Sequence, residues 1–70
     1  MRAKSNLKEL LDLRGITIRQ FAEMTGLPFE TLRRLYNDTT KQYQRNTIGV
    51  ICKTLNVGIG ELLILADDEE

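Results

Sequence analysis

Four side chains with strong hydrogen-bonding groups fall within one short stretch of the chain: Glu30, Arg33, Arg34 and Asn37. On a helix with Leu32 and Leu35 facing inward, a rotation of about 100° per residue turns three of the four outward and leaves Arg33 on the flank. The guanidinium fork of an arginine matches the two acceptors of guanine in the DNA major groove, and a glutamate can accept from the amino group of cytosine. The stretch therefore predicts contacts with base edges, and Arg34 is the leading candidate.

Each of these side chains also has another interpretation. Glu30 and Arg34 stand four residues apart and can form an ion pair with each other on an exposed face. Arg33 suits a phosphate as well as a base. Phe29, at the groove end of the same helix, can touch a thymine methyl group, be buried, or face a second subunit. The predicted set of base contacts is Phe29, Glu30, Arg33, Arg34 and Asn37.

A second group of polar residues is expected to contact the DNA backbone. The free N–H groups at the start of the preceding helix attract anions, and the predicted phosphate contacts there are Thr17, Arg19 and Gln20. A polar run follows the recognition stretch, where the chain should pass along the backbone, and its candidates are Lys41, Gln42, Tyr43, Gln44 and Arg45. Taken singly, each of these is an ordinary solvated side chain. Arg2 and Lys4 form either an arm on the DNA or a disordered start.

The composition gives little support for catalysis, metal binding or membrane insertion. The chain of 70 residues has no histidine, the usual proton carrier near neutral pH, and its carboxylates form no recognisable acid–base pair. Its one cysteine, Cys52, lies on the apolar stripe of a predicted helix and is expected to be a buried structural thiol. No apolar run is long enough for a membrane span. We therefore predict a cytoplasmic protein that is not an enzyme, with no metal, no cofactor and no evident small-molecule ligand.

The net charge is zero, but the charges are unevenly distributed. Residues 1–45 contain nine basic and five acidic side chains, a balance of +4, whereas residues 46–70 contain one basic and five acidic side chains, a balance of −4. A polyanion responds to the local patch rather than to the sum, so the first part of the chain is suited to nucleic acid. A solvated surface with an acidic tail explains the same numbers.

The apolar residues follow a helical period, and polar residues mark where helices begin and end. A first helix is expected from Asn6, which has the spacing of a capping pair with Glu9, to a left-handed exit at Gly15. A second helix begins at Thr17, which has the spacing of a capping box with Gln20.

Three further elements are expected after the second helix. The third helix is opened by Pro28, whose missing N–H needs no partner in a first turn. Residues 37–45 are typical of a loop. The fourth helix runs from about Thr47, capped by Asn46, to Leu55. A short last element, from Ile59 to Leu65, is predicted as a helix, although its end at 62–65 fits a strand equally well.

Residues 18–35 meet the geometric demands of two short helices that cross steeply through a tight turn. Such helices need a small residue where they touch and glycine where the chain turns with positive φ, and Ala22 and Gly26 supply these. The apolar residues that flank and close the wedge are Phe21, Leu27, Leu32 and Leu35. An ordinary helical hairpin shows the same spacing, but the combination favours a helix-turn-helix.

The segment Phe21-Ala22-Glu23-Met24-Thr25-Gly26-Leu27, followed by Thr31-Leu32 and Leu35, resembles the helix-turn-helix of the lambda-repressor and Cro family. Residues 47–57 and 61–63 are similar to the helices that follow the motif in small bacterial members, so the resemblance covers about residues 6–65. It implies a compact, all-α, five-helix domain that binds double-stranded DNA in the major groove. It also implies a dimer on a two-fold operator and a role in transcription regulation, often as a repressor.

The resemblance leads to a domain organisation with three parts. Residues 1–5 are expected to be a flexible basic arm, 6–65 the DNA-binding domain, and 66–70 an acidic tail. The helix-turn-helix spans about 17–36 and its recognition helix about 28–36. The chain departs from the family at Ile18, Pro28, Asp38 and residues 58–60. At Asp38 the family often has glycine, and a carboxylate is unfavourable near phosphates.

The last element is more apolar than a short surface segment needs, because its side chains cannot all face one small core. Part of it is expected to form a symmetric homodimer interface, with the candidates Ile59, Leu62, Leu63 and Leu65. The alternative is that the element covers the base of the core.

The leading hypothesis is a bacterial or phage-type transcriptional repressor that occupies a DNA operator. The rival is a protein-interaction module that keeps the helix-turn-helix fold without binding DNA, which the zero net charge, Ile18 and Asp38 favour. RNA binding is a weaker third possibility, because the chain lacks an aromatic stacking surface. A steep fall of affinity with salt distinguishes DNA binding from the rival.

Overall fold

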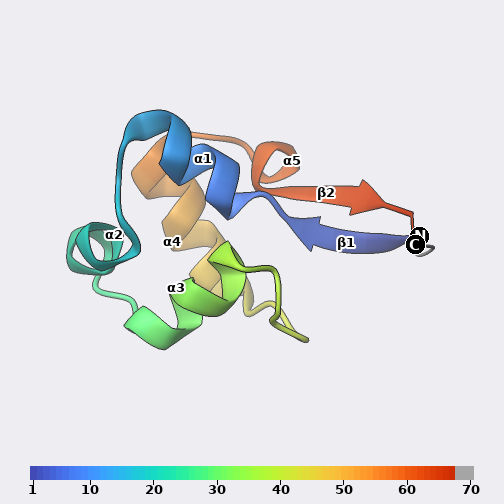
Figure 1. The fold of residues 1–70 in the computed structure, drawn as a ribbon, viewed down its shortest axis with the longest axis horizontal. Coiled ribbons are helices and arrows are strands. Elements are labelled where there is room, and N and C mark those ends of the chain that lie inside the picture. Colours follow the sequence, from blue (N-terminus) through green and yellow to red (C-terminus); the bar gives the residue numbers. More distant parts are fainter. Residues whose placement is uncertain (68–70) are drawn as a thin grey trace.

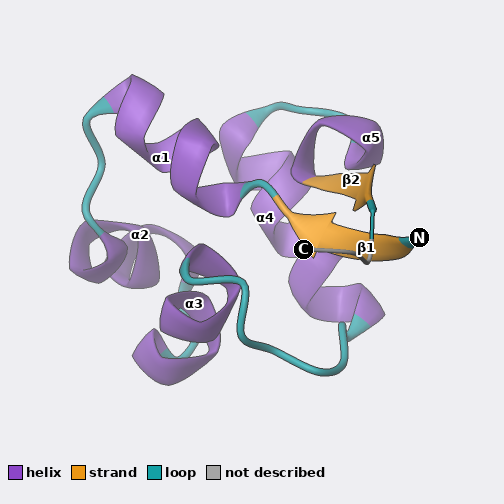
Figure 2. Ribbon diagram, turned by 45° about the vertical axis from the view of Figure 1, so that its right-hand side comes forward, coloured by secondary structure: helices purple, strands orange, loops and turns teal. Residues whose placement is uncertain are grey.

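The computed structural model describes residues 1–67 and arranges them as five helices and one pair of strands (Figure 1). In chain order, the elements are β1 (Arg2–Ser5), α1 (Leu7–Arg14), α2 (Ile18–Thr25), α3 (Phe29–Tyr36), α4 (Arg45–Leu55), α5 (Ile59–Leu62) and β2 (Leu63–Ala66). Figure 2 shows the helices gathered in one body, with the strand pair at one end.

A single apolar core joins the helices. Its buried residues come from all five, and they are Leu7, Leu11, Phe21, Leu32, Leu35, Ile48, Ile51, Leu55 and Leu62. In α1, α3 and α4, which contribute more than one residue each, a spacing of three or four residues brings them to one face. Cys52 packs against this core, but it is half-buried rather than buried as expected. The core fixes how α2 and α3 lie relative to each other and to α1 and α4.

The five expected helices are present, but the fold is not strictly all-α, and residues 2–5 form a strand instead of a flexible N-terminal arm. β1 pairs with β2 in antiparallel register, Arg2 opposite Ala66 and Ser5 opposite Leu63. The four residues of β2 are Leu, Ile, Leu and Ala. Leu63 and Ala66, at the two ends of the strand, are half-buried, whereas Ile64 and Leu65 between them are exposed. The last element is therefore one turn of helix followed by a strand, and Ala66, expected to start the acidic tail, belongs to β2. Residues 68–70 of that tail lie outside the described residues.

Two predicted helix caps are wrong. Asn6 precedes α1, but its side chain makes no cap hydrogen bond and donates instead to the carbonyl of Glu61 at 3.2 Å. The N–H of Leu7 is bound by the hydroxyl of Ser5 at 3.2 Å. At the fourth helix, α4 begins at Arg45 rather than near Thr47, without a side-chain cap. In the first case a tertiary partner takes the side chain that local spacing assigns to the helix.

The two predicted left-handed glycines are confirmed. Gly15 ends α1 with φ 68°, and Gly26 ends α2 with φ 77°. Two non-glycine residues also have positive φ: Asp38, two residues after the end of α3, with 57°, and Asn56, directly after α4, with 58°. Asparagine and aspartate tolerate this conformation better than most residues, because their short polar side chains can bond locally.

Candidate nucleic-acid interface

The start of α2 is fixed by a complete capping box. The backbone N–H of Gln20 donates to the Thr17 hydroxyl at 3.1 Å, and the N–H of Thr17 donates to Gln20 Oε1 at 2.9 Å. This confirms the spacing prediction. It also means that Oε1 of Gln20 is engaged within the helix, which leaves the amide nitrogen of the side chain for a phosphate.

The turn between α2 and α3 is held by both backbone and side-chain bonds. The N–H of Gly26 donates to the carbonyl of Ala22 at 2.9 Å. The hydroxyl of Thr25 donates to the carbonyl of Phe21 at 2.8 Å and accepts from the N–H of Leu27 at 3.1 Å. These hydrogen bonds restrain the turn, which therefore holds α3 in one orientation relative to α2.

The inner and outer faces of α3 are those that the sequence predicts. Leu32 and Leu35 are buried in the core. The polar residues on the opposite side are exposed, and they are Glu30, Arg33, Arg34 and Asn37. A helix with this division can enter a groove without losing its packing, as a recognition helix must.

On the outer face, Glu30 pairs with Arg33 and not with Arg34. Both Nε and NH2 of Arg33 donate to Glu30 Oε1, at 3.1 and 2.8 Å. The hydrogen bond from Arg33 lowers the pKa of the Glu30 carboxyl. In the described part of the chain, the Arg34 guanidinium makes no direct hydrogen bond or ion pair. The two neighbouring arginines thus differ: one is held, and one is available to a ligand.

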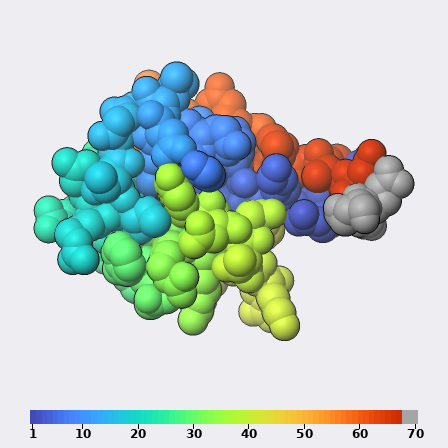
Figure 3. Space-filling model, viewed as in Figure 1, coloured from blue at the N-terminus to red at the C-terminus, as the bar shows by residue number. Residues whose placement is uncertain are grey.

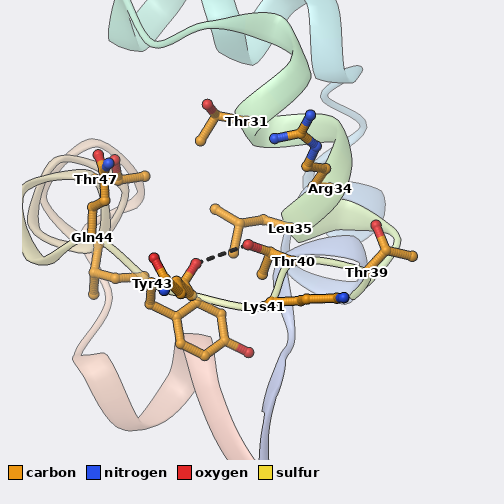
Figure 4. A pocket seen from close by; sticks show the side chains of 11 residues that line it. Thr31, Arg34, Leu35, Thr39, Thr40, Lys41, Tyr43, Gln44 and Thr47 are labelled. Carbon is orange, nitrogen blue, oxygen red and sulfur yellow. Dashed lines mark hydrogen bonds between the residues drawn. The ribbon is translucent and has the colours of Figure 1, made fainter.

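Arg34 lines a hollow of about 590 Å³ between α3, the following loop and the start of α4. In Figure 4, Thr31 and Arg34 extend from α3, Gln44 and Thr47 stand across from them, and Lys41 and Tyr43 lie along the loop side. The polar groups of this lining are hydroxyls, amides and two cations. Such a set is suited to anionic oxygens, because each group can donate a hydrogen bond.

The N-terminal end of α3 meets the start of α2. The Arg19 guanidinium lies over the Phe29 ring, 5.4 Å from its centroid, and Phe29 is 38% exposed. Phe29 is therefore a support for Arg19 as well as a candidate contact. These two residues and Thr17 line a second hollow, of about 610 Å³, beside the free N–H groups of α2. This places a cation and a helix start at one location, which suits a phosphate.

The loop after α3 brings most of the predicted backbone contacts to one side of the molecule. Lys41, Gln42, Gln44 and Arg45 are exposed, whereas Tyr43 is half-buried against the core. The space-filling view shows this segment projecting from the body beside the end of α3 (Figure 3). Burial, followed by the charge of Asp38, raises the pKa of Tyr43 above its ordinary value. Tyr43 therefore anchors the loop against the core.

A polar cluster on α1 braces α3 from behind. The Tyr36 hydroxyl donates to Asp12 Oδ1 at 2.7 Å, Lys8 Nζ binds Asp12 Oδ2 at 2.8 Å, and Lys8 lies 5.3 Å from the centroid of the Tyr36 ring. The hydrogen bonds from Lys8 and Tyr36 lower the pKa of Asp12, and the same contact with Asp12 raises the pKa of Tyr36. The sequence analysis did not detect this brace, since its members are 24 residues apart.

Neither Arg2 nor Lys4 is part of a loose arm. Both belong to β1, and Arg2 forms an ion pair with Asp38 at 3.3 Å. Asp38 also accepts a hydrogen bond from the N–H of Ser5 at 2.9 Å, so its carboxylate faces β1. The unfavourable approach to phosphates that the sequence suggests for Asp38 is thereby reduced.

The four candidate dimer residues do not lie on one surface. Leu62 is fully buried in the core of the monomer, so it is unavailable to a partner in this conformation. Leu63 is half-buried against the same core. Ile59 and Leu65 are 61% and 70% exposed, and Ile64 joins them with 37%. The exposed apolar surface is therefore smaller than the sequence suggests and includes Ile64.

Thr31, Thr39 and Thr47 line the hollow beside Arg34 but are missing from the predicted contacts. Thr31 could have been predicted from the sequence, because it precedes Arg34 by three residues and so lies on the same face of the helix. No sequence signal marks Thr39 or Thr47, because their place depends on how the loop folds back.

A family model for the Cro/C1-type helix-turn-helix DNA-binding domain matches residues 6–68. No curated protein matches the chain. Within residues 1–67, no cluster of three or more potential ligand side chains could hold a metal ion. None of the helices described has the length and apolar character to cross a bilayer.

Proposed function

We propose that this chain, which belongs to the Cro/C1-type helix-turn-helix DNA-binding domains, reads a specific operator with α3 in the major groove and acts as a repressor. The family is non-enzymatic, and its members bind DNA and regulate transcription. The observation that carries this proposal is the outer face of α3. It presents Arg34, which has no hydrogen-bond or ion-pair partner within residues 1–67, on a helix whose other face is packed into the core.

The proposed base contacts differ in strength. Arg34 can reach the two acceptors of a guanine, a pair worth roughly 1–3 kcal/mol of discrimination against other bases. Glu30 and Arg33 act as a bonded pair, and Asn37 lies at the far end of the helix. The Arg19 guanidinium covers one face of the Phe29 ring, so Phe29 contacts a thymine methyl group with the edge of its ring. Arg34 therefore carries most of the base discrimination.

The proposed phosphate contacts come from the two ends of the motif. At the start of α2 they are Thr17, Arg19 and the Gln20 side-chain amide. Beyond α3 they are Lys41, Gln42, Tyr43, Gln44 and Arg45, with the hollow beside Arg34 receiving a backbone phosphate. Two anion-binding ends that flank one reading helix fit the course of a DNA strand past a groove.

We further propose that two copies assemble through β2. Within residues 1–67, β2 has β1 as its only strand neighbour, and its outer edge carries no charged residue. The outer edge of β1 is covered, because the N–H of Ser5 donates to Asp38 and the carbonyl of Ala3 accepts from Arg2 at 3.4 Å. Unpaired edges are templates for another strand, so a second copy pairing β2 with β2 would complete the sheet. The exposed apolar residues Ile59, Ile64 and Leu65 would be shielded by this contact.

The experiment that tests the proposal is selection of bound duplexes from a random DNA library, at a low and a moderate salt concentration. A palindromic consensus is expected, with affinity falling steeply as salt rises, since each neutralised phosphate contributes a slope of about −0.9 to log K against log salt. The rival function, a protein-interaction module with the same fold, predicts no enrichment even at low salt. A lacZ reporter with the selected site across its promoter then tests repression.

A further inference from the structure

Asp38 occupies a backbone conformation that favours glycine. Asp38 comes directly after Asn37, the residue that follows the last residue of α3, and its φ is 57°. The N–H of Asp38 donates to the carbonyl of Leu35 at 3.2 Å, and the N–H of Thr39 donates to the carbonyl of Arg34 at 2.9 Å. These two bonds form a Schellman motif, in which the left-handed position is usually glycine because a Cβ is strained there. The aspartate at this position makes side-chain contacts that a glycine could not make.

The contacts of the Asp38 carboxylate all lead to β1. Oδ1 accepts the N–H of Ser5 at 2.9 Å, Oδ2 pairs with Arg2 at 3.3 Å, and the side chain is only 18% exposed. Ser5 is itself buried, and its hydroxyl caps the start of α1 by accepting from Leu7. The carboxylate therefore ties the exit of α3 to a strand that the core and β2 already hold.

The residues directly after Asp38 are those that line the hollow beside Arg34. Thr39, Thr40 and Lys41 follow in sequence, and all three belong to its lining. Tyr43 holds the far end of the loop against the core, and within residues 39–44 the Thr40 hydroxyl donates to the carbonyl of Gln42 at 2.8 Å, but neither contact ties the near end of the loop to another element. The direction in which the loop leaves α3 thus depends on where Asp38 is held.

We infer that Asp38 is a positioning residue for the DNA-contacting loop, and that β1 controls DNA affinity through it without touching DNA. The effect on affinity rests on the proposed function, whereas the fixing of the loop is a property of the free protein. Removing a hydrogen bond to a charged group at this point releases the loop and costs roughly ten-fold in DNA affinity.

Two variants separate positioning from charge. Asp38→Asn and Asp38→Gly remove the same negative charge, and both residues tolerate the left-handed backbone, but only asparagine keeps an acceptor for the N–H of Ser5. If charge alone mattered, both would bind DNA more tightly than wild type. We expect Asp38→Asn to stay within about three-fold of wild type and Asp38→Gly to bind about ten-fold more weakly, with a shallower salt dependence. Equal affinity of the two variants would overturn the inference.

Amide exchange in the absence of DNA keeps the inference testable on its own. By NMR, the amides of Ser5 and Thr39, which donate to the Asp38 carboxylate and to the carbonyl of Arg34, are expected to exchange at least about ten-fold faster in Asp38→Gly than in Asp38→Asn, while the core amides of α4 stay unchanged. Unchanged exchange of the Thr39 amide would overturn the inference whatever the DNA result. If wild type binds no selected duplex, the proposed function fails, and the exchange rates still decide whether Asp38 fixes the loop.

Discussion

The guanidinium of Arg33 donates two hydrogen bonds to one carboxylate oxygen of Glu30, from NH2 at 2.8 Å and from Nε at 3.1 Å. This contact uses the i,i+3 spacing and leaves the i,i+4 neighbour, Arg34, outside the pair. The two adjacent arginines therefore differ in their contacts: Arg33 is bonded to Glu30, and Arg34 is not. The pair is exposed and contributes little to stability, so its consequence is the orientation of Arg33.

Glu30→Gln is expected to broaden the sequence preference more than it changes the stability. The substitution removes the anion that holds Arg33, so both arginines become free to contact bases or phosphates. In library selection, we expect the variant to bind more sites, with less information at the base pair that faces residue 30. A consensus identical to that of wild type would show that the ion pair does not set specificity.

Gly26→Ala and Gly49→Ala form a matched pair that tests the helix-turn-helix turn. Apart from the adjoining backbone, no heavy atom lies within 4 Å of a Cβ built at either position, so an alanine meets no tertiary clash at either. Gly26 has φ 77°, where an alanine costs about 1–2 kcal/mol, whereas Gly49 lies within α4, where alanine stabilises by roughly 0.5–1 kcal/mol. Thermal unfolding should therefore show opposite shifts of Tm. Shifts of the same sign would mean that the turn does not need its left-handed glycine.

Acid is expected to weaken the brace between α1 and α3. The pKa of Asp12 is lowered in the folded protein, chiefly by the hydrogen bond from Lys8, so its contribution is complete above the ordinary value of 3.8 and is lost as pH falls below it. Glu30, lowered from 4.5, acts in the same direction. Urea unfolding at pH 6 and pH 3 should show a larger acid-induced loss for wild type than for Asp12→Asn. Equal losses would place the acid sensitivity elsewhere.

Leu65→Lys and Leu62→Ala should separate assembly from folding. Leu65 is mostly exposed at the edge proposed for the second copy, so the lysine is expected to abolish dimers while leaving Tm nearly unchanged at low concentration. Leu62 is buried, and its truncation should cost about 2–5 kcal/mol of unfolding free energy. Sedimentation velocity gives the oligomeric state of each. A dimer that survives Leu65→Lys would move the interface away from β2.

The helix-turn-helix was predictable from sequence because its determinants are local. Thr17 and Gln20 cap each other across one turn, Gly26 supplies the turn, and Leu32 and Leu35 alone decide which face of α3 is inside. The choice of Arg33 over Arg34 as the partner of Glu30 was not predictable, because both spacings are allowed on a helix.

The strand pair was not predictable, because each of its halves is ambiguous alone. Arg2–Ser5 has no apolar pattern, and residues 62–65 fit a helix or a strand. The two segments, which are about 60 residues apart, take strand conformation because they pair with each other, with Ser5 of β1 opposite Leu63 of β2. Asp38 depends on the same long-range event, so its partner on β1 was equally hidden.

The central claim is that Arg34 reads a base from α3. Its most direct test is the affinity of wild type and of Arg34→Ala for the selected duplex and for each of its single base-pair variants, with Arg45→Ala as a phosphate-contact control. We predict that Arg34→Ala loses roughly 1–3 kcal/mol of discrimination at one base pair in each half-site and keeps the rest, while Arg45→Ala weakens binding to all duplexes alike. A uniform loss across all duplexes for Arg34→Ala, or no loss, would contradict the account.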